Sequence, residues 1–328
     1  MAREKWNLTQ TPTITKLSFG RWKCKKNREQ SRADRTWGKR LGDCMDEYIA
    51  MKSSVLSPST LREYRNIRRR NLQSLVNMRL ENITQRDIQI AINKEALNHS
   101  PKSVRNYHGF LTAVLAVYRP EFQVKTTLPQ KVKPDIEIPS DDDVKRMLSA
   151  AEGTPLELPI YLAACCGMRR SEICGLKWKD IDLKKGKIHI HDAIVLGTDG
   201  YVKKGTKTTA SKRTISAFPA VLNVLTAKAE GKHPSDNVCE LTPNQITSGF
   251  TKLLARAELR HIRFHDLRHY AVSTMLSLNI PKNYIADYVG HETEHMIDQV
   301  YGHIKANSKE RFTEILNTYY SNLFGDSN

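Results

Sequence analysis

Side chains suited to binding an anion recur in the second half of the sequence. His265 and Arg268 lie three residues apart in RFHDLRHYAVSTML, at the start of a helix predicted over Asp266 to Leu278. At this spacing both side chains project to one side of the helix, where N-terminal backbone N–H groups attract an anion. A guanidinium adds a planar fork of donors that matches phosphate oxygens. The segment therefore predicts a position for a phosphate.

Three further segments hold one candidate each. Arg169, in CGMRRSEICGLKW, falls between two predicted helices, where a side chain can reach into a cleft. Lys207 lies in a Gly/Thr-rich turn, GTKTTASKRTIS, and Tyr301 follows the pair Gly290-His291 near the end of the chain. Taken singly, each has an ordinary alternative: a salt-bridge arginine, a solvated lysine and a half-buried tyrosine.

The histidines in this half of the sequence could instead form a zinc site. They show neither HExxH spacing nor a partnership with paired cysteines. No metal and no cofactor are therefore expected. The histidines concerned are His265, His269, His291, His295 and His303.

Charge indicates the class of partner. The chain has 328 residues, with 52 Lys and Arg against 35 Asp and Glu, a net charge of +17. Such an excess favours a polyanion, either nucleic acid or an acidic membrane surface. No segment has the apolar length of a membrane span or a signal core, and the six cysteines lack regular spacing, which indicates reduced thiols in a cytoplasmic protein.

The charge is concentrated at the N-terminus. Residues 1–40 contain twelve Lys and Arg and three acids, a net +9. The segment has no sustained apolar periodicity, so residues 1–35 are predicted to form a basic arm that contacts the phosphate backbone, with a solvated tail as the alternative.

Residues 36–120 are predicted to form a bundle of four helices. Apolar residues recur there at three- and four-residue steps, and Ser-Pro or Thr caps precede the helices. The segment SPSTLREYRNIRRRNLQSL carries arginines that lie either along DNA or on a merely solvated face. They are Arg62, Arg65, Arg68 and Arg69.

Residues 121–139 hold three prolines and no helical period, which predicts a linker. Residues 140–328 are then a second domain of helices with one small antiparallel sheet, from short β-type segments between Lys187 and Ser216. The fold class is therefore mainly α, with an N-terminal helical bundle and a mixed α/β second domain.

The order of these motifs resembles that of the tyrosine recombinases, the phage-integrase family of site-specific DNA recombinases. The resemblance covers about Thr36 to Phe324 and rests on CGMRRSEICGLKWKDID, FHDLRHYAVSTML and YVGHETEHMIDQVYGHI. It implies a core-binding domain in the bundle and a catalytic domain after it. It also implies six catalytic residues: Arg169, Lys207, His265, Arg268, His291 and Tyr301.

The resemblance implies that Tyr301 is the nucleophile and leaves a 3′-phosphotyrosyl link. Two arginines would hold the phosphate, His265 would accept the tyrosine proton, and Lys207 would protonate the leaving 5′-oxygen. His291 would bind a phosphate oxygen, and Glu172 would orient the site. Lys203, Lys204 and Lys212 lie close to Lys207 in the same hairpin and remain alternatives to it.

The resemblance also implies a homotetramer that exchanges strands of two double-stranded DNA sites through a Holliday junction, in the nucleoid. An excisionase or a DNA-bending protein would be an accessory partner. The amphipathic segment NSKERFTEILNTYYSNLF would dock on a neighbouring subunit or pack on its own domain. The basic arm favours an integrase of a phage or integrative element. Alternatives are a chromosome-dimer-resolving recombinase, a type IB topoisomerase and an inactive DNA-binding regulator.

Overall fold

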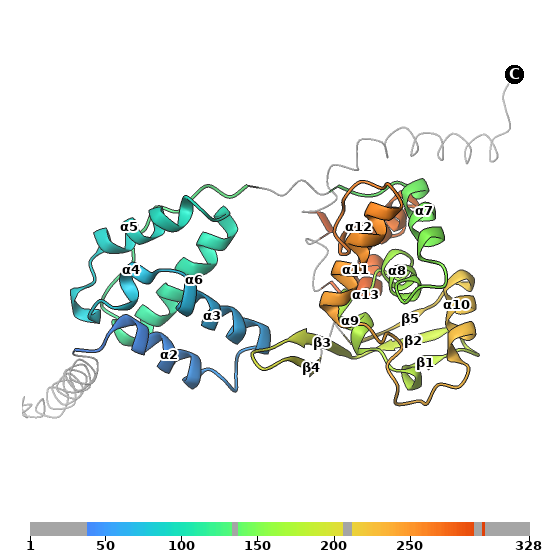
Figure 1. Ribbon diagram of the computed structural model, residues 1–328, viewed down its shortest axis with the longest axis horizontal. Coiled ribbons are helices and arrows are strands. Elements are labelled where there is room, and N and C mark those ends of the chain that lie inside the picture. The colour runs from blue at the N-terminus through green and yellow to red at the C-terminus, as the bar shows by residue number, and fades with distance from the viewer. Residues whose placement is uncertain (1–37, 133–136, 206–211, 292–296, 299–328) are drawn as a thin grey trace, which may run out of the picture. The chain divides into compact units, whose positions relative to one another are not determined.

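A computed structural model of the protein describes residues 38–132, 137–205, 212–291 and 297–298. The chain divides into two units, Met1–Lys133 and Pro134–Asn328, which carry helices and, in the second, short strands (Figure 1). No helix within these residues is both long and apolar enough to cross a membrane. The predicted basic arm, Lys207, Tyr301 and the predicted C-terminal helix lie outside the described residues.

The first unit is helical, as predicted. Local capping sets its helix starts: Ser57 and Ser100 each accept a backbone N–H and precede a proline, and Thr84 forms a capping box with Asp87. The helices are α2 (Leu41–Met51), α3 (Pro58–Arg70), α4 (Gln73–Val76), α5 (Gln85–Ala96) and α6 (Pro101–Tyr118), with a 3₁₀ turn at Leu80–Asn82. The long helical pattern predicted after Ser57 is divided at Leu72, whose φ is 55°.

Residues after α6 pack back on this unit. Gln85 and Gln89 lie one turn apart on α5. The side-chain amide of each donates one hydrogen bond to the backbone of residues 123–127 and accepts another from it. Gln89 accepts from Thr127 N at 2.9 Å and donates to Thr127 O at 3.1 Å. The first part of the predicted linker therefore lies on the helical unit, where its apolar side chains meet the core. These side chains are Phe122, Val124 and Leu128.

The second unit combines seven helices with two small antiparallel sheets among its described residues. The helices are α7 (Asp141–Ala151), α8 (Glu157–Ala164), α9 (Arg170–Gly175), α10 (Pro219–Ala229), α11 (Pro243–Arg256), α12 (Asp266–Ser277) and α13 (Lys282–Val289). A 3₁₀ turn at Trp178–Asp180 follows α9. The predicted helix from Asp266 is confirmed as α12.

The strands form a three-stranded sheet in the order β1-β2-β5 and a separate pair, β3-β4. Their bounds are β1 Ile181–Asp182, β2 Lys187–Ile190, β3 Asp192–Leu196, β4 Tyr201–Gly205 and β5 Arg213–Ser216. In β2 exposed and buried residues alternate, and Ile188 pairs with Ile215 in the core. The antiparallel pairing is as predicted, but it is distributed over two sheets.

Helix α8 is apolar on most sides and lies in the core of this unit. Helix α9 follows it and packs so closely on β3 that a Cβ on Gly175 would lie 2.9 Å from the carbonyl carbon and oxygen of Asp192. Because those atoms are backbone, they cannot rotate away. This contact fixes α9, the helix that begins beside Arg169, against the hairpin that leads toward residue 207.

Gly175→Ala is therefore expected to destabilise the second unit by about 1–3 kcal/mol, because α9 must move away from β3. Calorimetric unfolding checks this. Gly109→Ala is the matched control: it lies within α6, where an added Cβ meets nothing within 4 Å. There alanine should stabilise the helix by about 1 kcal/mol. Equal effects of the two substitutions would contradict the close packing of α9.

Candidate active site

Arg169 is held in place at the start of α9. Its backbone N–H donates to Glu172 Oε2 at 3.0 Å and its Nη1 donates to Glu172 Oε1 at 2.7 Å. Its Nη2 donates to the carbonyl of Gly290 at 2.6 Å, across 121 residues of sequence. Arg169 therefore lies beside the residue that precedes His291, as the predicted site requires.

Arg213, on β5, is a member of this network that sequence reasoning missed. It donates to both oxygens of Glu172, at 3.3 Å and 2.9 Å, and its Nε donates to the carbonyl of Tyr288 at 2.8 Å. Its side chain is 6% exposed and that of Glu172 is 3% exposed. Glu172 thus joins two guanidiniums from separate elements.

The charge on Glu172 is maintained by its partners. Burial acts to raise the pKa of this carboxyl, but the hydrogen bonds and positive charges of Arg213 and Arg169 outweigh it and hold the pKa below its usual value. Glu172 is therefore ionised at neutral pH, and it compensates one of the two positive charges beside it.

Arg268 is a buried cation in the same region. Only 2% of the residue is exposed, and its Nη1 donates to the carbonyl of Gly167, at the turn between α8 and α9. Gly167 has φ +62°, and a Cβ there would lie 2.9 Å from Val289. The turn that presents Arg169 therefore needs glycine at 167, and α12 supplies Arg268 to the same turn.

The pKa values of both candidate histidines, His265 and His291, are lowered, which favours the neutral imidazole at physiological pH. Burial and then the charges of Arg268 and Arg169 lower the pKa of His291 to about 3. Burial also lowers the pKa of His265, to about 4, and His269, Arg268 and Arg169 act in the same direction. His265 is nevertheless an exposed residue, so water weakens these effects there more than at His291, which is half-buried. The structure thus brings His265, His291, Arg169 and Arg268 into one region of the second unit.

The guanidiniums and the neutral imidazoles of this region can take different parts in a reaction. The guanidiniums can bind anionic oxygens, and a neutral imidazole can accept a proton or donate a hydrogen bond. Nδ1 of His291 is buried and has no hydrogen-bond partner among the described residues. Those residues also contain no group of three or more His, Cys, Asp or Glu placed to hold a metal ion.

The lysines that are alternatives to Lys207 have different surroundings. Lys203 on β4 forms an ion pair with Asp192 at 2.7 Å, which engages its ammonium in the β3-β4 hairpin. Lys207 itself lies outside the described residues, as does Tyr301. Lys204 also has an interaction partner, and Lys212 is exposed just before β5.

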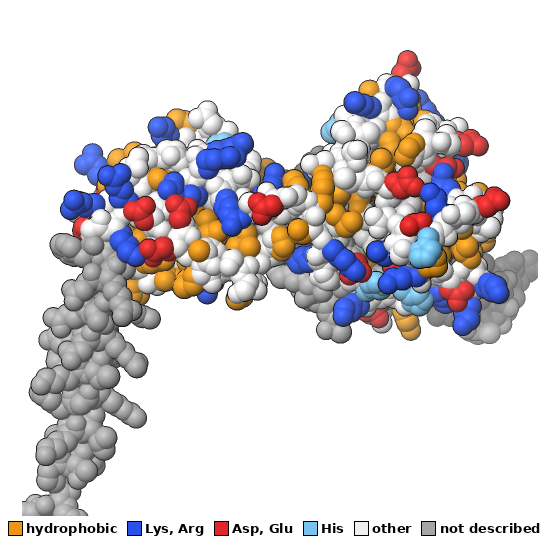
Figure 2. All heavy atoms as spheres, turned by 60° about the horizontal axis from the view of Figure 1, so that its bottom comes forward, with side chains coloured by type: hydrophobic (Ala, Val, Ile, Leu, Met, Phe, Trp, Pro, Cys, Tyr) orange, Lys and Arg blue, Asp and Glu red, His pale blue; other side chains and the backbone are white. Residues whose placement is uncertain are grey.

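The predicted DNA-binding arginines of α3 have different environments. Arg62, Arg65 and Arg69 are exposed, whereas Arg68 donates to the carbonyl of Gly42 at 3.0 Å and forms an ion pair with Asp46 at 3.0 Å. Arg68 therefore stabilises the packing of α3 on α2, and the outward positive charge of α3 comes from the other three together with the exposed Arg70 at its end. Figure 2 shows Lys and Arg side chains on the visible surface of both units.

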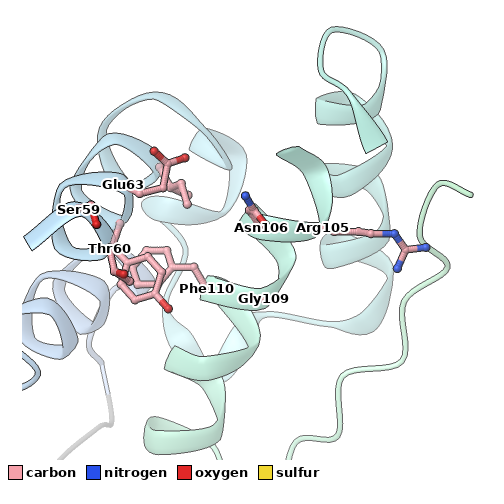
Figure 3. A pocket seen from close by; sticks show the side chains of 9 residues that line it. Ser59, Thr60, Glu63, Arg105, Asn106, Gly109 and Phe110 are labelled. Carbon is pink, nitrogen blue, oxygen red and sulfur yellow. The ribbon is translucent and has the colours of Figure 1, made fainter. Parts of the chain in front are cut away.

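A pocket of about 510 Å³ lies between α3 and α6. Figure 3 shows Glu63 and Asn106 on its two sides, with Phe110 beneath them, while Arg105 points away from it. Arg105 instead donates to the carbonyl of Pro129 at 2.7 Å. The helical unit thus offers hydrogen-bonding side chains in a groove beside the exposed face of α3.

The sequence matches models of known protein families. The model described as "Phage integrase family" matches residues 140–308, over half of the chain. The chain belongs to the phage integrase family of tyrosine recombinases. Enzymes of this family cleave and rejoin DNA, so the predicted enzyme class is confirmed. A second model, an N-terminal SAM-like domain of phage integrases, matches residues 40–96 in the helical unit.

Individual relatives agree with this assignment. The recombinase is 24% identical over 326 residues to a XerC-like tyrosine recombinase of Caldanaerobacter subterraneus subsp. tengcongensis, covering 85% of this chain and 83% of the relative. It is 31% identical over 165 residues to the integrase of Staphylococcus phage L54a, covering 44% of this chain and 47% of the relative.

Solved structures share the fold. The Tn1549 transposon integrase in complex with transposon right end DNA matches with a TM-score of 0.69 and 18% identity, covering 85% of this chain and 100% of that one. A lambda integrase tetramer bound to a Holliday junction matches with a TM-score of 0.58 and 18% identity, covering 82% and 79%. The predicted two-domain fold is therefore confirmed.

Glu172→Gln is expected to destabilise the recombinase by about 3 kcal/mol, because two guanidiniums then share no carboxylate in a buried site. Chemical denaturation measures this. The control is Glu240→Gln, which removes an exposed carboxylate paired with Lys232 at 2.8 Å and should leave the unfolding midpoint unchanged. An unchanged midpoint for Glu172→Gln would contradict the role of the network.

Acidification from about pH 7 to about pH 5 is expected to destabilise the DNA-free recombinase through His265 and His291. Unfolded histidines have a pKa near 6.5. Because the folded pKa values are lower, at about 4 and about 3, the unfolded chain binds more protons in this window, and the free energy of unfolding falls. His291→Gln should lose less stability over the same change. Equal losses in the two proteins would contradict a lowered pKa of His291.

Proposed function

We propose that the protein is a site-specific integrase of a mobile element, which cuts DNA with Tyr301 and rejoins it to a second site. The observation that supports this is the gathering of Arg169, Arg268, His265 and His291, from segments far apart in sequence, around one anion-binding position. The motif that places Tyr301 ten residues after His291 supplies the nucleophile.

The first chemical step is the attack of the Tyr301 hydroxyl oxygen on the scissile phosphorus. A P–O bond to the tyrosine forms, and the bond from phosphorus to the 5′-oxygen breaks. His265 takes the phenol proton, a role that its neutral form allows, and Lys207 gives a proton to the departing 5′-oxygen. The product is a 3′-phosphotyrosyl enzyme and a free 5′-hydroxyl.

The guanidiniums account for the activation of the phenol. With a pKa near 10, a phenol is about one part in a thousand ionised at neutral pH, a deficit of about 4 kcal/mol. Arg169 and Arg268 favour the phenolate and the charge that develops on the phosphoryl oxygens. His291 donates a hydrogen bond to one of these oxygens. The phosphotyrosine conserves the bond energy, so the second strand rejoins by the reverse reaction and no nucleotide is needed.

The assembly that we propose is a homotetramer on two duplex sites, which exchanges strands in pairs through a Holliday junction in the nucleoid. The lambda integrase tetramer on a Holliday junction, similar in fold, supports this proposal. The exposed arginines of α3 and the basic residues 1–35 would contact the phosphate backbone. An excisionase or a DNA-bending protein would control direction.

A second candidate is a chromosome-dimer-resolving recombinase, which the similarity to a XerC-like relative over 85% of this chain supports. Deletion of the gene distinguishes the two functions. Loss of excision of a neighbouring element supports the integrase, whereas accumulation of chromosome dimers supports the resolving enzyme.

Tyr301→Phe is expected to abolish covalent attachment to DNA, because phenylalanine lacks the attacking oxygen. The measurement uses a nicked duplex from the recombination site beside the gene, on which cleavage releases a short strand and traps the adduct. Denaturing electrophoresis then detects it. Tyr284→Phe is the control. Because Tyr284 is 65% exposed on α13, this variant should form the adduct as the unaltered protein does. An adduct with Tyr301→Phe would refute Tyr301 as the nucleophile.

A further inference from the structure

A basic cleft extends from the candidate active site along α11. Its volume is about 540 Å³, and it begins at Arg169 and His265. Its remaining lining includes two more arginines, a histidine and two threonines of α11, and none of its residues is acidic. These five are Arg170, Arg263, His261, Thr247 and Thr251.

The three guanidiniums in this cleft differ in how their charge is compensated. Arg169 pairs with Glu172 at 2.7 Å and Arg263 pairs with Asp266 at 2.8 Å. Arg170 has no carboxylate within 4.0 Å among the described residues and donates to the hydroxyl of Thr247. Arg170 is therefore a half-buried cation whose neighbours in the cleft leave its charge uncompensated.

The position of Arg170 separates it from the first anion site. Consecutive residues at the start of a helix project about 100° apart, and Arg169 turns to Glu172 and Gly290 while Arg170 turns to α11. On α11, the hydroxyl of Thr247 donates to Pro243 O at 3.1 Å and that of Thr251 to Thr247 O at 3.1 Å. These bonds commit both hydroxyl protons to the backbone of α11, so Thr247 and Thr251 form the exposed wall of the cleft beside the guanidinium, and the donors that face an anion are those of Arg170 and His261.

A cation that is partly removed from water and lacks a carboxylate favours an anion from outside the protein. We propose that Arg170, with His261, binds a second backbone phosphate of the DNA in this cleft, beside Thr247 and Thr251 and adjacent to the phosphate held by Arg169 and His265. The inference rests on the proposed function, because it takes DNA as the anion. Two phosphates held at one cleft would fix the position and direction of the strand relative to Tyr301.

The salt dependence of DNA binding tests this site. Each phosphate neutralised by the protein contributes about 0.9 to the slope of log affinity against log salt. Arg170→Gln should therefore reduce the slope by about 0.9 on a short duplex of random sequence, whereas Arg170→Lys keeps the charge and should keep the slope. Lys145→Gln, which removes an exposed charge paired with Asp142 outside the cleft, is the matched control and should not change it.

Two outcomes would overturn the proposal: a slope for Arg170→Gln equal to that of the unaltered protein, or the same reduction with Lys145→Gln. Thr251→Glu is the second variant, and it keeps the test decisive if Arg170→Gln folds poorly. Thr251 is exposed, so the change should preserve folding while a carboxylate in the cleft repels the phosphate and weakens binding. Undiminished binding by Thr251→Glu would also overturn the proposal.

Because binding to a random duplex needs no cleavage, this result is separable from that of the adduct experiment. A reduced slope with no adduct from the unaltered protein would support the phosphate site and refute the proposed reaction. An adduct from the unaltered protein, together with an unchanged slope for Arg170→Gln, would support the proposed reaction and refute the phosphate site.

Discussion

The carboxylate of Glu172 lies between two guanidiniums, and the arrangement of the candidate site depends on it. Arg169 and Arg213 bind its two oxygens and also reach the carbonyls of Gly290 and Tyr288. One buried anion thus connects the start of α9, strand β5 and the end of α13. Without it the buried guanidinium of Arg213 and the partly exposed one of Arg169 would face each other, and the chain segments that carry Arg169 and His291 would lose their common anchor.

The network leaves the site electropositive. Three guanidiniums, those of Arg169, Arg213 and Arg268, accompany one carboxylate. Burial and the charges of Arg169 and Arg268 lower the pKa values of His265 and His291, which favours the neutral imidazoles. Such an excess of positive charge favours a phosphate and the negative charge that develops on it. The same neutral state leaves His265 able to accept a proton. Electrostatics therefore links the packing of α9 to the chemistry expected of the family.

Local features of the sequence were sufficient for most helix starts and for the enzyme family, but not for the break at Leu72, which divides one expected helix into α3 and α4. Caps such as Ser140 and Thr84 act within four residues, and the His-x-x-Arg spacing acts within one helical turn. Arg213 was missed because its partner is 41 residues away and its segment resembles any exposed strand. The segment after α6 was predicted as a linker because it holds prolines and no helical period. It packs on α5 through backbone bonds to the side-chain amides of Gln85 and Gln89, which act across 38–40 residues of sequence.

The most direct test of the central claim removes the negative charge of the scissile phosphate, which the arginines are proposed to neutralise. Covalent adduct formation is measured with a neutral methylphosphonate at the scissile position, for the unaltered recombinase and for Arg169→Ala. If Arg169 acts by neutralising the phosphate, the variant should fail on the natural diester and recover on the methylphosphonate. A folded variant that is equally inactive on both substrates would contradict the account.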